Sequence, residues 1–275
     1  MAIADFTLTF DDFDALRTVI LNHCGIWLGE SKLSFLQLRL AERLRARNIS
    51  TAQEYYYFIK YDPQGSEELQ QLIDAITINE TWFFRETGPV EAWLATILPE
   101  LLKKQGGTLS LWSAGCATGE EPYTLAMLLL DAQRTSARRF SILATDISQQ
   151  ALEAARNASY DPYSLRRTEE RWQKQYFQPD GLRYLVNEEA RRMVHFGQAN
   201  LVDNTLAQRI QKMDLILCRN VLIYLSDAGR AVALDTFYRA LKPGGHLILG
   251  HSESLIHVRT SFEIARLEGK ILYRK

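Results

Sequence analysis

Two adjacent carboxylates, Glu120 and Glu121, follow a turn of small residues between an apolar run and an apolar helical stretch. Gly115, Ala117 and Gly119 make up that turn, so a ligand can approach the backbone closely. A diphosphate would need bare N–H groups and positive charge here, and the two carboxylates would repel it. They suit a ligand that carries an ammonium and a sulfonium, which describes S-adenosylmethionine.

The glycine spacing also argues against a dinucleotide. Gly115-x-x-x-Gly119 has two glycines where the dinucleotide fingerprint has three. Glu120 lies deeper in the turn and is the stronger candidate for binding the ligand. The alternative for both carboxylates, and more so for Glu121, is that they only complement the helix dipole.

Asp146 stands at the end of the second apolar run, residues 140–145. An acid at the end of the second strand can accept hydrogen bonds from both ribose hydroxyls. The alternative is a capping box formed by Asp146 and Gln149 for a helix over residues 148–157. We favour the ribose role, because Asp146 and the glycine turn belong to one site in this kind of fold.

Further candidates follow later apolar runs. Asn220 and Tyr224 come after the run Met213–Cys218, and ligands bind beyond the carboxyl ends of such strands. Both are therefore expected to face the reaction site, although Tyr224 as a core aromatic is the alternative. Asn200 and Leu201 end another run, where the backbone is placed to contact an adenine.

Strands and helices alternate regularly from Thr108, which predicts an open parallel sheet of the α/β class. The alternation breaks between residues 158 and 199. Leu182–Val186 and Arg192–Phe196 predict a small antiparallel unit inserted there. Residues 262–267 and 270–273 predict a hairpin across Glu268-Gly269.

Residues 1–78 predict a helical domain without strands. Ser50 and Ser66 are the expected caps of its third and fourth helices. The helix after Ser31 has a stripe of leucines, and beside it lie three cationic residues that share a face: Lys32, Arg39 and Arg43. This face is either a docking surface or an ordinary solvated surface.

Composition sets the outer bounds. The 275 residues are 47% hydrophobic and 24% charged with a formal net charge of −1, which is ordinary for a globular protein and gives no global field for nucleic acid. Cys24, Cys116 and Cys218 form neither a disulfide framework nor a metal cluster by spacing. No signal pattern or membrane-spanning run is present, so we expect a reducing cytoplasm.

Five motifs together resemble the CheR family of chemotaxis methyltransferases, nearly from end to end. They are NETWFFRE at 79–86, WSAGCATGEEPYTLAM at 112–127, ATDIS at 144–148, CRNVLIYL at 218–225 and LKPGGHLILGHSES at 241–254. The resemblance implies an all-α receptor-docking domain over residues 1–78. It also implies a Rossmann-like methyltransferase domain over residues 79–275, with a β-subdomain inserted at about 165–199.

The activity that the resemblance implies is methyl transfer from S-adenosylmethionine to glutamate side chains of chemoreceptors, in a bacterial cytoplasm. The products would be glutamate methyl esters and S-adenosylhomocysteine. A glutamate carboxylate is already ionised at neutral pH, so neither a metal nor a general base is expected. Two alternatives stay open: a methyltransferase of the same fold for another acceptor such as an amine, and a binding module without turnover.

Residue roles are implied in the same way. Tyr224 lies where the family has a tyrosine near the transferred methyl. The family's catalytic arginine is not carried over, since the helix over 89–105 offers only Lys103 and Lys104. Cofactor contacts are implied at Asn79, Thr81, Arg85, Glu120, Asp146, Asn200, Leu201, Asn220 and Val221.

The expected partner is the cytoplasmic helical region of chemoreceptors, whose glutamates the cationic face would steer. Residues 177–181 are a tight connection with little room for the longer glycine-containing loop with which some family members bind the receptor's C-terminal pentapeptide. We therefore expect a monomer that works without that tether, without nucleic acid and without membrane insertion.

Overall fold

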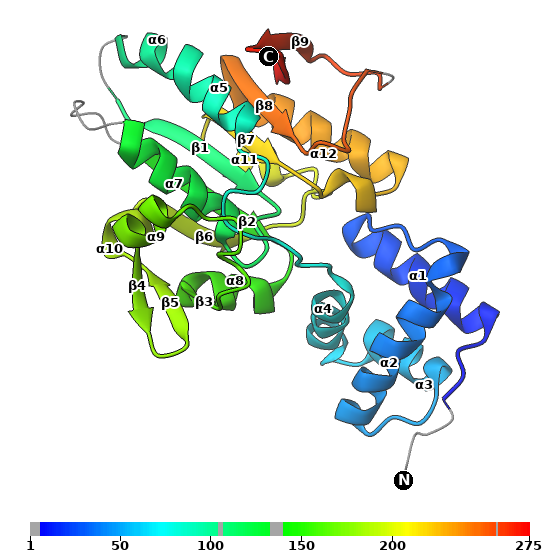
Figure 1. Cartoon of the computed structure of the whole chain (residues 1–275). Helices are drawn as coiled ribbons and strands as arrows, with labels where there is room; N and C mark the ends of the chain where they lie inside the picture. The colour runs from blue at the N-terminus through cyan, green and yellow to red at the C-terminus, as the bar shows by residue number, and fades with distance from the viewer. Residues whose placement is uncertain (1–5, 104–106, 133–139, 257) are drawn as a thin grey trace.

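The computed structural model describes residues 6–103, 107–132, 140–256 and 258–275. Lys104, weighed above, lies outside these residues. The chain forms a helical N-terminal part and a larger part built on a central sheet (Figure 1). Within the described ranges no helix combines the length and the apolar character that crossing a membrane requires.

The helical part packs four α-helices around a single core. They are α1 (Phe10–Cys24), α2 (Leu33–Arg47), α3 (Ala52–Tyr61) and α4 (Gly65–Ile76), with the short 3-10 turn η1 (Glu30–Lys32) before α2. The predicted leucine stripe is confirmed, because Leu36, Leu40 and Leu44 are all fully buried in this core.

The predicted caps of α3 and α4 are wrong by one or two residues. Thr51, not Ser50, caps α3 by accepting the N–H of Glu54 at 3.1 Å. Gln64 precedes α4, so Ser66 lies inside its first turn. Both neighbours are polar, and the choice between them depends on backbone angles that a sequence pattern does not specify.

The central sheet has seven strands in the order β6-β2-β1-β7-β8-β10-β9. Five strands are parallel, and β10 and β9 are antiparallel at one edge. The hairpin across Glu268 and Gly269 is confirmed, with φ of +47° and +75° at the two residues. The bounds are β1 Leu109–Ala114, β2 Phe140–Asp146, β6 Val194–Gln198, β7 Met213–Cys218, β8 Leu241–Leu249, β9 Glu263–Leu267 and β10 Lys270–Arg274.

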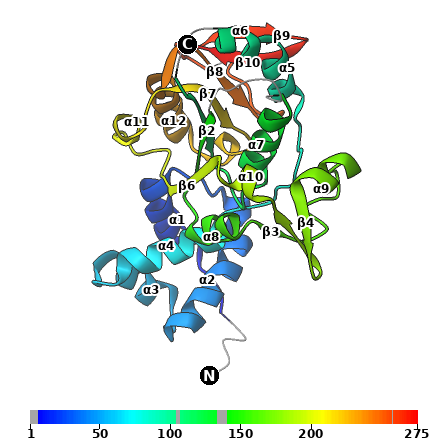
Figure 2. The same ribbon diagram turned by 90° about the vertical axis from the view of Figure 1, so that its left-hand side faces the viewer.

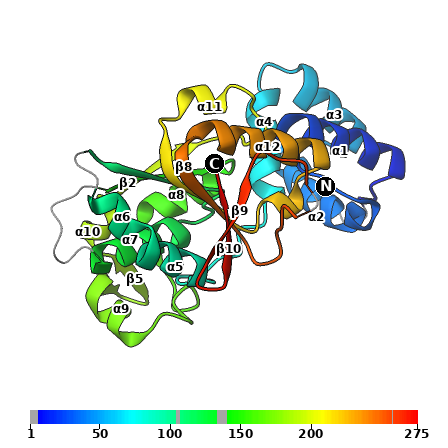
Figure 3. The ribbon, with the colours of Figure 1, turned by 90° about the horizontal axis from the view of Figure 1, so that it is seen from above.

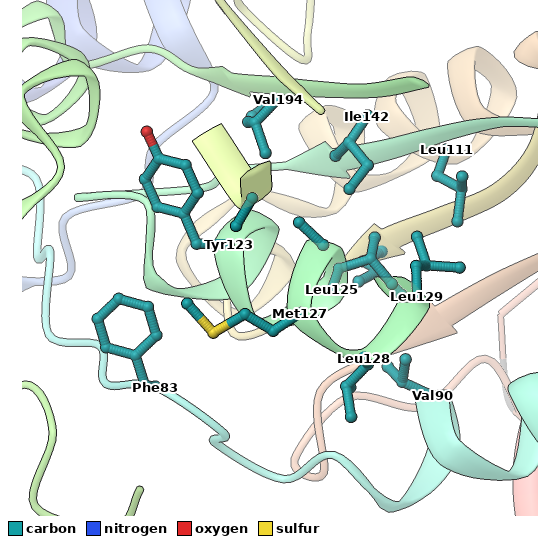
Figure 4. Close-up of a cluster of buried hydrophobic side chains, with 14 of the residues drawn as sticks. Phe83, Val90, Leu111, Tyr123, Leu125, Met127, Leu128, Leu129, Ile142 and Val194 are labelled. Carbon is teal, nitrogen blue, oxygen red and sulfur yellow. The ribbon is translucent and has the colours of Figure 1, made fainter. Parts of the chain in front are cut away.

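Helices cover both faces of this sheet (Figures 1 and 3). Leu111 of β1 joins the core under α5, α7 and α8, shown in Figure 4, whereas its neighbour Trp112 joins the core under α12. This alternation is why the strands read as continuous apolar runs. The bounds are α5 Gly88–Thr96, α6 Leu98–Lys103, α7 Glu120–Ala132, α8 Gln149–Asn157, α11 Leu206–Arg209 and α12 Asp227–Ala240.

Residues 89–103 form two helices where one was expected. Helix α5 ends at Thr96 and α6 begins at Leu98. Pro99 has no N–H to donate to the carbonyl of Ala95, which explains the break.

The small antiparallel sheet is present, but its strands differ from those predicted. It consists of β3 (Ser159–Tyr160), β5 (Arg183–Val186) and β4 (Phe177–Asp180), in that order, and is flanked by α9 (Glu170–Tyr176) and α10 (Glu188–Arg191). The run Arg192–Phe196 was wrongly assigned to it, because Val194–Gln198 is β6 and pairs in parallel with β2. Residues 177–180, expected as a connection, are a strand that pairs with β5.

The helical part contacts the carboxyl-end side of the sheet (Figure 2). Gln70 of α4 donates to the carbonyl of Ile147 at 3.0 Å, and Asp74 accepts the N–H of Gln149 at 2.9 Å. Gly25, which ends α1 with φ +73°, approaches Val202 so closely that a Cβ there would lie 2.6 Å from a Val202 methyl. These contacts hold the helical part against the strand ends.

Candidate active site

A cleft that is partly open to solvent lies where the helical part meets the ends of β1, β2 and β7. It is lined by strand-end loops, by the segment that joins the two parts and by the helical part itself. The predicted site residues that line it are Lys32, Asn79, Thr81, Arg85, Asp146, Asn200, Leu201, Asn220, Val221 and Tyr224. The fold thus gathers residues that are spread over nearly 200 positions of the sequence.

The glycine turn after β1 forms the floor of the cleft. Gly115 has φ +81°, and a Cβ there would lie 2.3 Å from a methyl of Val221, so only glycine fits. The N–H groups of Gly115 and Cys116 both donate to the carbonyl of Thr145, at 2.7 and 2.9 Å. This ties the turn to the end of β2.

Asp146 joins the same turn from the β2 side. One carboxylate oxygen accepts the N–H of Ala117 at 2.8 Å, and the other accepts the N–H of Ser148 at 2.9 Å. Burial raises the pKa of Asp146, and these backbone donors oppose the rise. A carboxylate can accept about four hydrogen bonds, so Asp146 keeps acceptor capacity for a hydroxyl donor. The capping-box alternative is wrong, because Ser148 caps α8 through the N–H of Ala151.

The two glutamates of α7 point in different directions, and the prediction chose the one that faces away from the cleft. Glu120 is 2% exposed and bonds Thr118 and Ser164 instead. Glu121 lines the cleft and accepts the Ser113 hydroxyl at 2.7 Å. Successive residues of a helix point about 100° apart, which is how Glu121 lines the cleft while Glu120 bonds Ser164. Burial raises the pKa of Glu120.

Arg219 is a cleft residue that the sequence did not single out. Its guanidinium donates to Glu121 at 3.2 Å and to the carbonyl of Arg85 at 2.6 Å, and its side chain is only 6% exposed. It therefore joins the end of β7, the start of α7 and the segment between the two parts. The only signal in the sequence was its place directly after an apolar strand.

Glu253 is a second residue that the sequence did not reveal. Its carboxylate accepts four backbone N–H groups: Asn220 at 2.8 Å, Val221 at 2.9 Å, Ile223 at 3.3 Å and Gly250 at 2.8 Å. Asn220 has φ +60°, an uncommon conformation outside glycine. The four bonds fix the loop after β7 in this strained form.

Tyr224 ends that loop, in the short 3-10 helix η2 (Leu222–Tyr224). Its side chain is 37% exposed and lines the cleft, so the alternative of a buried core aromatic is wrong. Its carbonyl accepts the N–H of Trp27 at 2.9 Å, and the next residues pair with the stretch after α1. The helical part thereby helps to position this tyrosine.

Asn200 lines the cleft but its side chain is already engaged. The amide donates to the carbonyl of His23 at 2.6 Å, and its oxygen accepts the N–H of Val202 at 3.2 Å. The side chain of Asn200 thus already has partners, and the predicted contact of its backbone with an adenine stays a prediction. Leu201 beside it is buried and contributes apolar surface.

The predicted cationic face does not remain free as a whole. Arg43 forms two bonds to Glu68, at 2.8 and 2.9 Å, and Glu68 is fully buried. Arg47 and Tyr55 bond the same carboxylate. The role of Arg43 in docking is therefore corrected to a structural one. Arg39 lies 3.8 Å from Glu42 but has 38% of its side chain exposed, and Lys32 lines the cleft, so both can still present positive charge.

The Cys116 thiol and the possible metal ligands among the described residues concern two other kinds of chemistry. Burial raises the pKa of the Cys116 thiol well above its usual range, and the nearby carboxylates add to this effect. No group of three or more His, Cys, Asp or Glu side chains in those ranges has a geometry that could hold a metal ion.

The residues present fit S-adenosylmethionine. Gly115 lets the turn approach Val221 where any Cβ would clash, and Asp146 keeps acceptor capacity beside its bonds to Ala117 and Ser148. Glu121 provides a carboxylate for the ammonium end. The Nε of Arg85 is buried with no hydrogen-bond partner, and a guanidinium there suits the ligand's carboxylate.

Comparison with known proteins agrees with this geometry. The family model described as "CheR methyltransferase, SAM binding domain" matches residues 79–271, and "CheR methyltransferase, all-alpha domain" matches residues 11–77. The chain is 33% identical to chemotaxis protein methyltransferase 2 of Vibrio cholerae, over 98% of this chain and 95% of that protein. It is 35% identical to chemotaxis protein methyltransferase 1 of Pseudomonas aeruginosa, over 96% of this chain and 97% of that protein.

Proposed function

Because this chain belongs to the CheR family of chemotaxis methyltransferases, we propose that it methylates glutamate side chains of chemoreceptors. It is an S-adenosylmethionine-dependent methyltransferase of chemotaxis. The products are glutamate γ-methyl esters and S-adenosylhomocysteine. The observation that carries the proposal is the gathering of the family's motif residues around one cleft, whose lining includes the carboxylates of Asp146 and Glu121.

Asp146, Glu121 and Arg85 hold the cofactor in this proposal, through its ribose, ammonium and carboxylate respectively. When bound, S-adenosylmethionine supplies a methyl group activated by a positive sulfur. Val221 and Leu201 provide apolar walls, and Asn79, Thr81 and Asn220 provide polar ones. Glu120 stabilises this arrangement by accepting hydrogen bonds from the hydroxyls of Thr118 and Ser164.

The chain has little chemistry to perform beyond positioning. The acceptor carboxylate is ionised at neutral pH and needs no proton removed. Tyr224 sits at the open side of the cleft, where its hydroxyl can donate to the acceptor or orient it. Glu253 keeps Tyr224 in place by fixing the loop before it, so the reacting atoms meet in line.

The acceptor docks on the side of the cleft formed by the helical part. Lys32 lines the cleft and Arg39 follows it on the same face of α2, and receptor bundles rich in glutamate complement these cations. The receptor's helical region lies in the cytoplasm, which places the reaction there. One copy of the chain contains every residue that the proposal uses, so a monomer is sufficient for the reaction.

Independence from the receptor's C-terminal tether has support from the small sheet. The N–H of Val186 donates to Ala158, on the β3 side, so the backbone groups of Leu185 and Arg183 face β4, opposite Gln178 and Asp180. The outward positions of β4 are then 177 and 179. Phe177 already donates to Gln173, and proline has no N–H. This edge offers no backbone donor to an added strand, so the pentapeptide should show no binding in a titration.

Mass spectrometry tests the proposal. Candidate receptor fragments would be incubated with the chain and S-adenosylmethionine and searched for methyl groups on glutamate. Loss of the added methyl group in mild alkali identifies an ester. A methyl group that resists alkali would favour the alternative of an amine acceptor. Cofactor binding without methyl transfer would favour a non-catalytic binding module.

A further inference from the structure

Two arginines stack on one tryptophan at the rim of the cleft. The Cζ atoms of Arg85 and Arg166 lie 4.5 and 4.2 Å from the ring centroid of Trp82. Trp82 and Arg85 line the cleft, whereas Arg166 comes from the segment between β3 and α9. Arg166 also lies 3.8 Å from the ring centroid of Tyr163, which is exposed.

Neither guanidinium is neutralised by a carboxylate within the described part of the chain. Arg85 donates to the carbonyl of Glu80 at 3.0 Å, and Arg166 donates to the carbonyl of Tyr163 at 2.7 Å. Arg219 differs, because its charge is satisfied by Glu121 and Glu86 and its side chain is buried. Of the two arginines on Trp82, Arg85 is half-buried in the cleft and Arg166 is exposed, so Arg166 presents its positive charge to solvent.

Stacking on aromatic rings prepares Arg166 to bind an anion. A guanidinium held flat on a ring loses little further freedom on binding, and its N–H groups still point outward in its own plane. A carboxylate can then accept from them at an orientation set in advance. A single exposed lysine would not provide this fixed geometry.

We propose that Arg166 binds a carboxylate of the acceptor next to the glutamate that is methylated. The inference rests on the proposed function, because it takes the acceptor to be an acidic helical segment of a chemoreceptor. Arg85 and Trp82 line the cleft and Arg166 does not, so Arg166 contacts the same ring from outside the residues that surround the cofactor. Arg166 would thus select acceptors with a second acidic residue.

The test measures binding separately from turnover. The full chain, saturated with S-adenosylhomocysteine, is titrated with the cytoplasmic fragment of a chemoreceptor from the same genome. Arg166→Ala should raise the Kd of the fragment about tenfold, as for the loss of one charged hydrogen bond at a partly exposed site. Arg166→Lys should fall between, since it keeps the charge without the planar fork. Affinity for S-adenosylhomocysteine should change less than about twofold.

Arg171→Ala is the matched control. Arg171 also stacks on an aromatic ring, at 4.7 Å from Trp172, but it is paired with Glu169 at 2.9 Å. It lies in α9, close in sequence to Arg166, and should leave the Kd of the fragment unchanged. Melting temperatures of all variants show whether a loss reflects unfolding.

A second arm identifies the contacted carboxylate. Acidic residues flanking the methylated glutamate of the fragment are changed one at a time to their amides. One of these substitutions should weaken binding of the fragment to the wild-type chain. The same substitution should not further weaken its binding to Arg166→Ala, as expected when the two residues contact each other directly.

The inference would be overturned if Arg166→Ala bound the receptor fragment as tightly as wild type does. It would also be overturned if the variant lost affinity only for S-adenosylhomocysteine, or if the wild-type chain did not bind the fragment. Fragment binding that depends on Arg166 without base-labile methyl transfer would instead leave the inference standing and contradict the proposed function.

Discussion

The carboxylate of Glu253 accepts the backbone N–H of Asn220 at 2.8 Å, across 33 residues of sequence. Asn220 has φ +60° at the end of β7, and the same carboxylate holds the next residues of its loop. A strained backbone persists when its surroundings fix it. Glu253 therefore acts on Tyr224 and Asn220 through the loop and without touching the reacting atoms.

Changing Glu253 to Gln should lower turnover and stability together. The amide would place N–H donors against the backbone donors that the carboxylate accepts, at a cost of about 1.5–3 kcal/mol for charged hydrogen bonds. Turnover should fall by more than cofactor affinity, and Glu253→Asp should recover little because its side chain is shorter. Glu263→Gln, at an exposed position on β9, is the control. Steady-state kinetics and thermal melts of the three variants would decide.

Asp146→Asn should weaken S-adenosylmethionine binding by roughly 1.5–3 kcal/mol if Asp146 holds the ribose. Asparagine keeps one acceptor oxygen for the N–H of Ala117 or Ser148, whereas Ala removes both and loosens the turn. Calorimetry on the folded variant measures the affinity. An unchanged Kd would leave Asp146 with a purely structural role in joining the turn to β2.

Tyr224→Phe should reduce turnover and leave cofactor affinity nearly intact. The ring keeps its place on η2, and only the hydroxyl at the open side of the cleft is lost. An interaction made mainly in the transition state lowers kcat without changing cofactor binding. A parallel fall in cofactor affinity would show instead that the hydroxyl serves binding.

The cationic residues of the helical part should separate into two classes. Arg43→Ala should lower the free energy of unfolding by on the order of 3 kcal/mol, because it leaves buried Glu68 short of a partner. Lys32→Glu with Arg39→Glu should leave the melting temperature nearly unchanged. The double variant should methylate receptor more slowly at low salt, with a flatter salt dependence. Equal methylation rates across a salt series would make this face an ordinary solvated surface.

His246 should make the protein less stable at acidic pH. Burial and the nearby Arg274 lower its pKa below 6.5 in the folded chain. Below pH 6.5 the unfolded chain binds a proton that the folded chain does not, so the stability falls as pH decreases through 6.5 toward the folded pKa. The contribution is constant above pH 6.5, where both states are neutral.

Urea unfolding of wild type and His246→Gln between pH 5 and 8 measures this effect. Below pH 6.5, the free energy of unfolding of the variant should change less steeply with pH than that of wild type. The difference in slope, which His246 provides, is at most about 1.4 kcal/mol per pH unit. His251→Gln, at an exposed position, is the control. Parallel curves for wild type and His246→Gln would contradict the prediction.

Much of the fold was determined by local patterns. Strand β7 coincides with the predicted run Met213–Cys218, and the glycine turn follows β1 as expected, because parallel strands buried on both faces are continuous apolar runs. Asp146 could be placed at the site for the same reason, since the end of a strand fixes the position of the next residue. The helical character of residues 10–76 followed from leucine periodicity.

The remaining features depended on residues far apart in sequence. Arg192–Phe196 reads as a strand, but only the packing of β2 against Val194 decides which sheet it joins. Spacing placed Arg43 beside Arg39 on one face, and only the approach of α4 with Glu68 turned it inward. The periodicity of a helix gives angles between its own residues, and it does not show which neighbour will stand opposite.

The candidate site likewise depends on contacts between residues that are far apart in sequence. The sequence alone determined that two carboxylates follow the turn, and the way α7 docks on the sheet decided that Glu121 faces the cleft and Glu120 faces Ser164. The sequence supplied Arg219 and Glu253 as ordinary charged residues after strands. Only tertiary structure gave them roles, because a charge buried among distant backbone groups takes its partners from the fold and not from its neighbours in the chain.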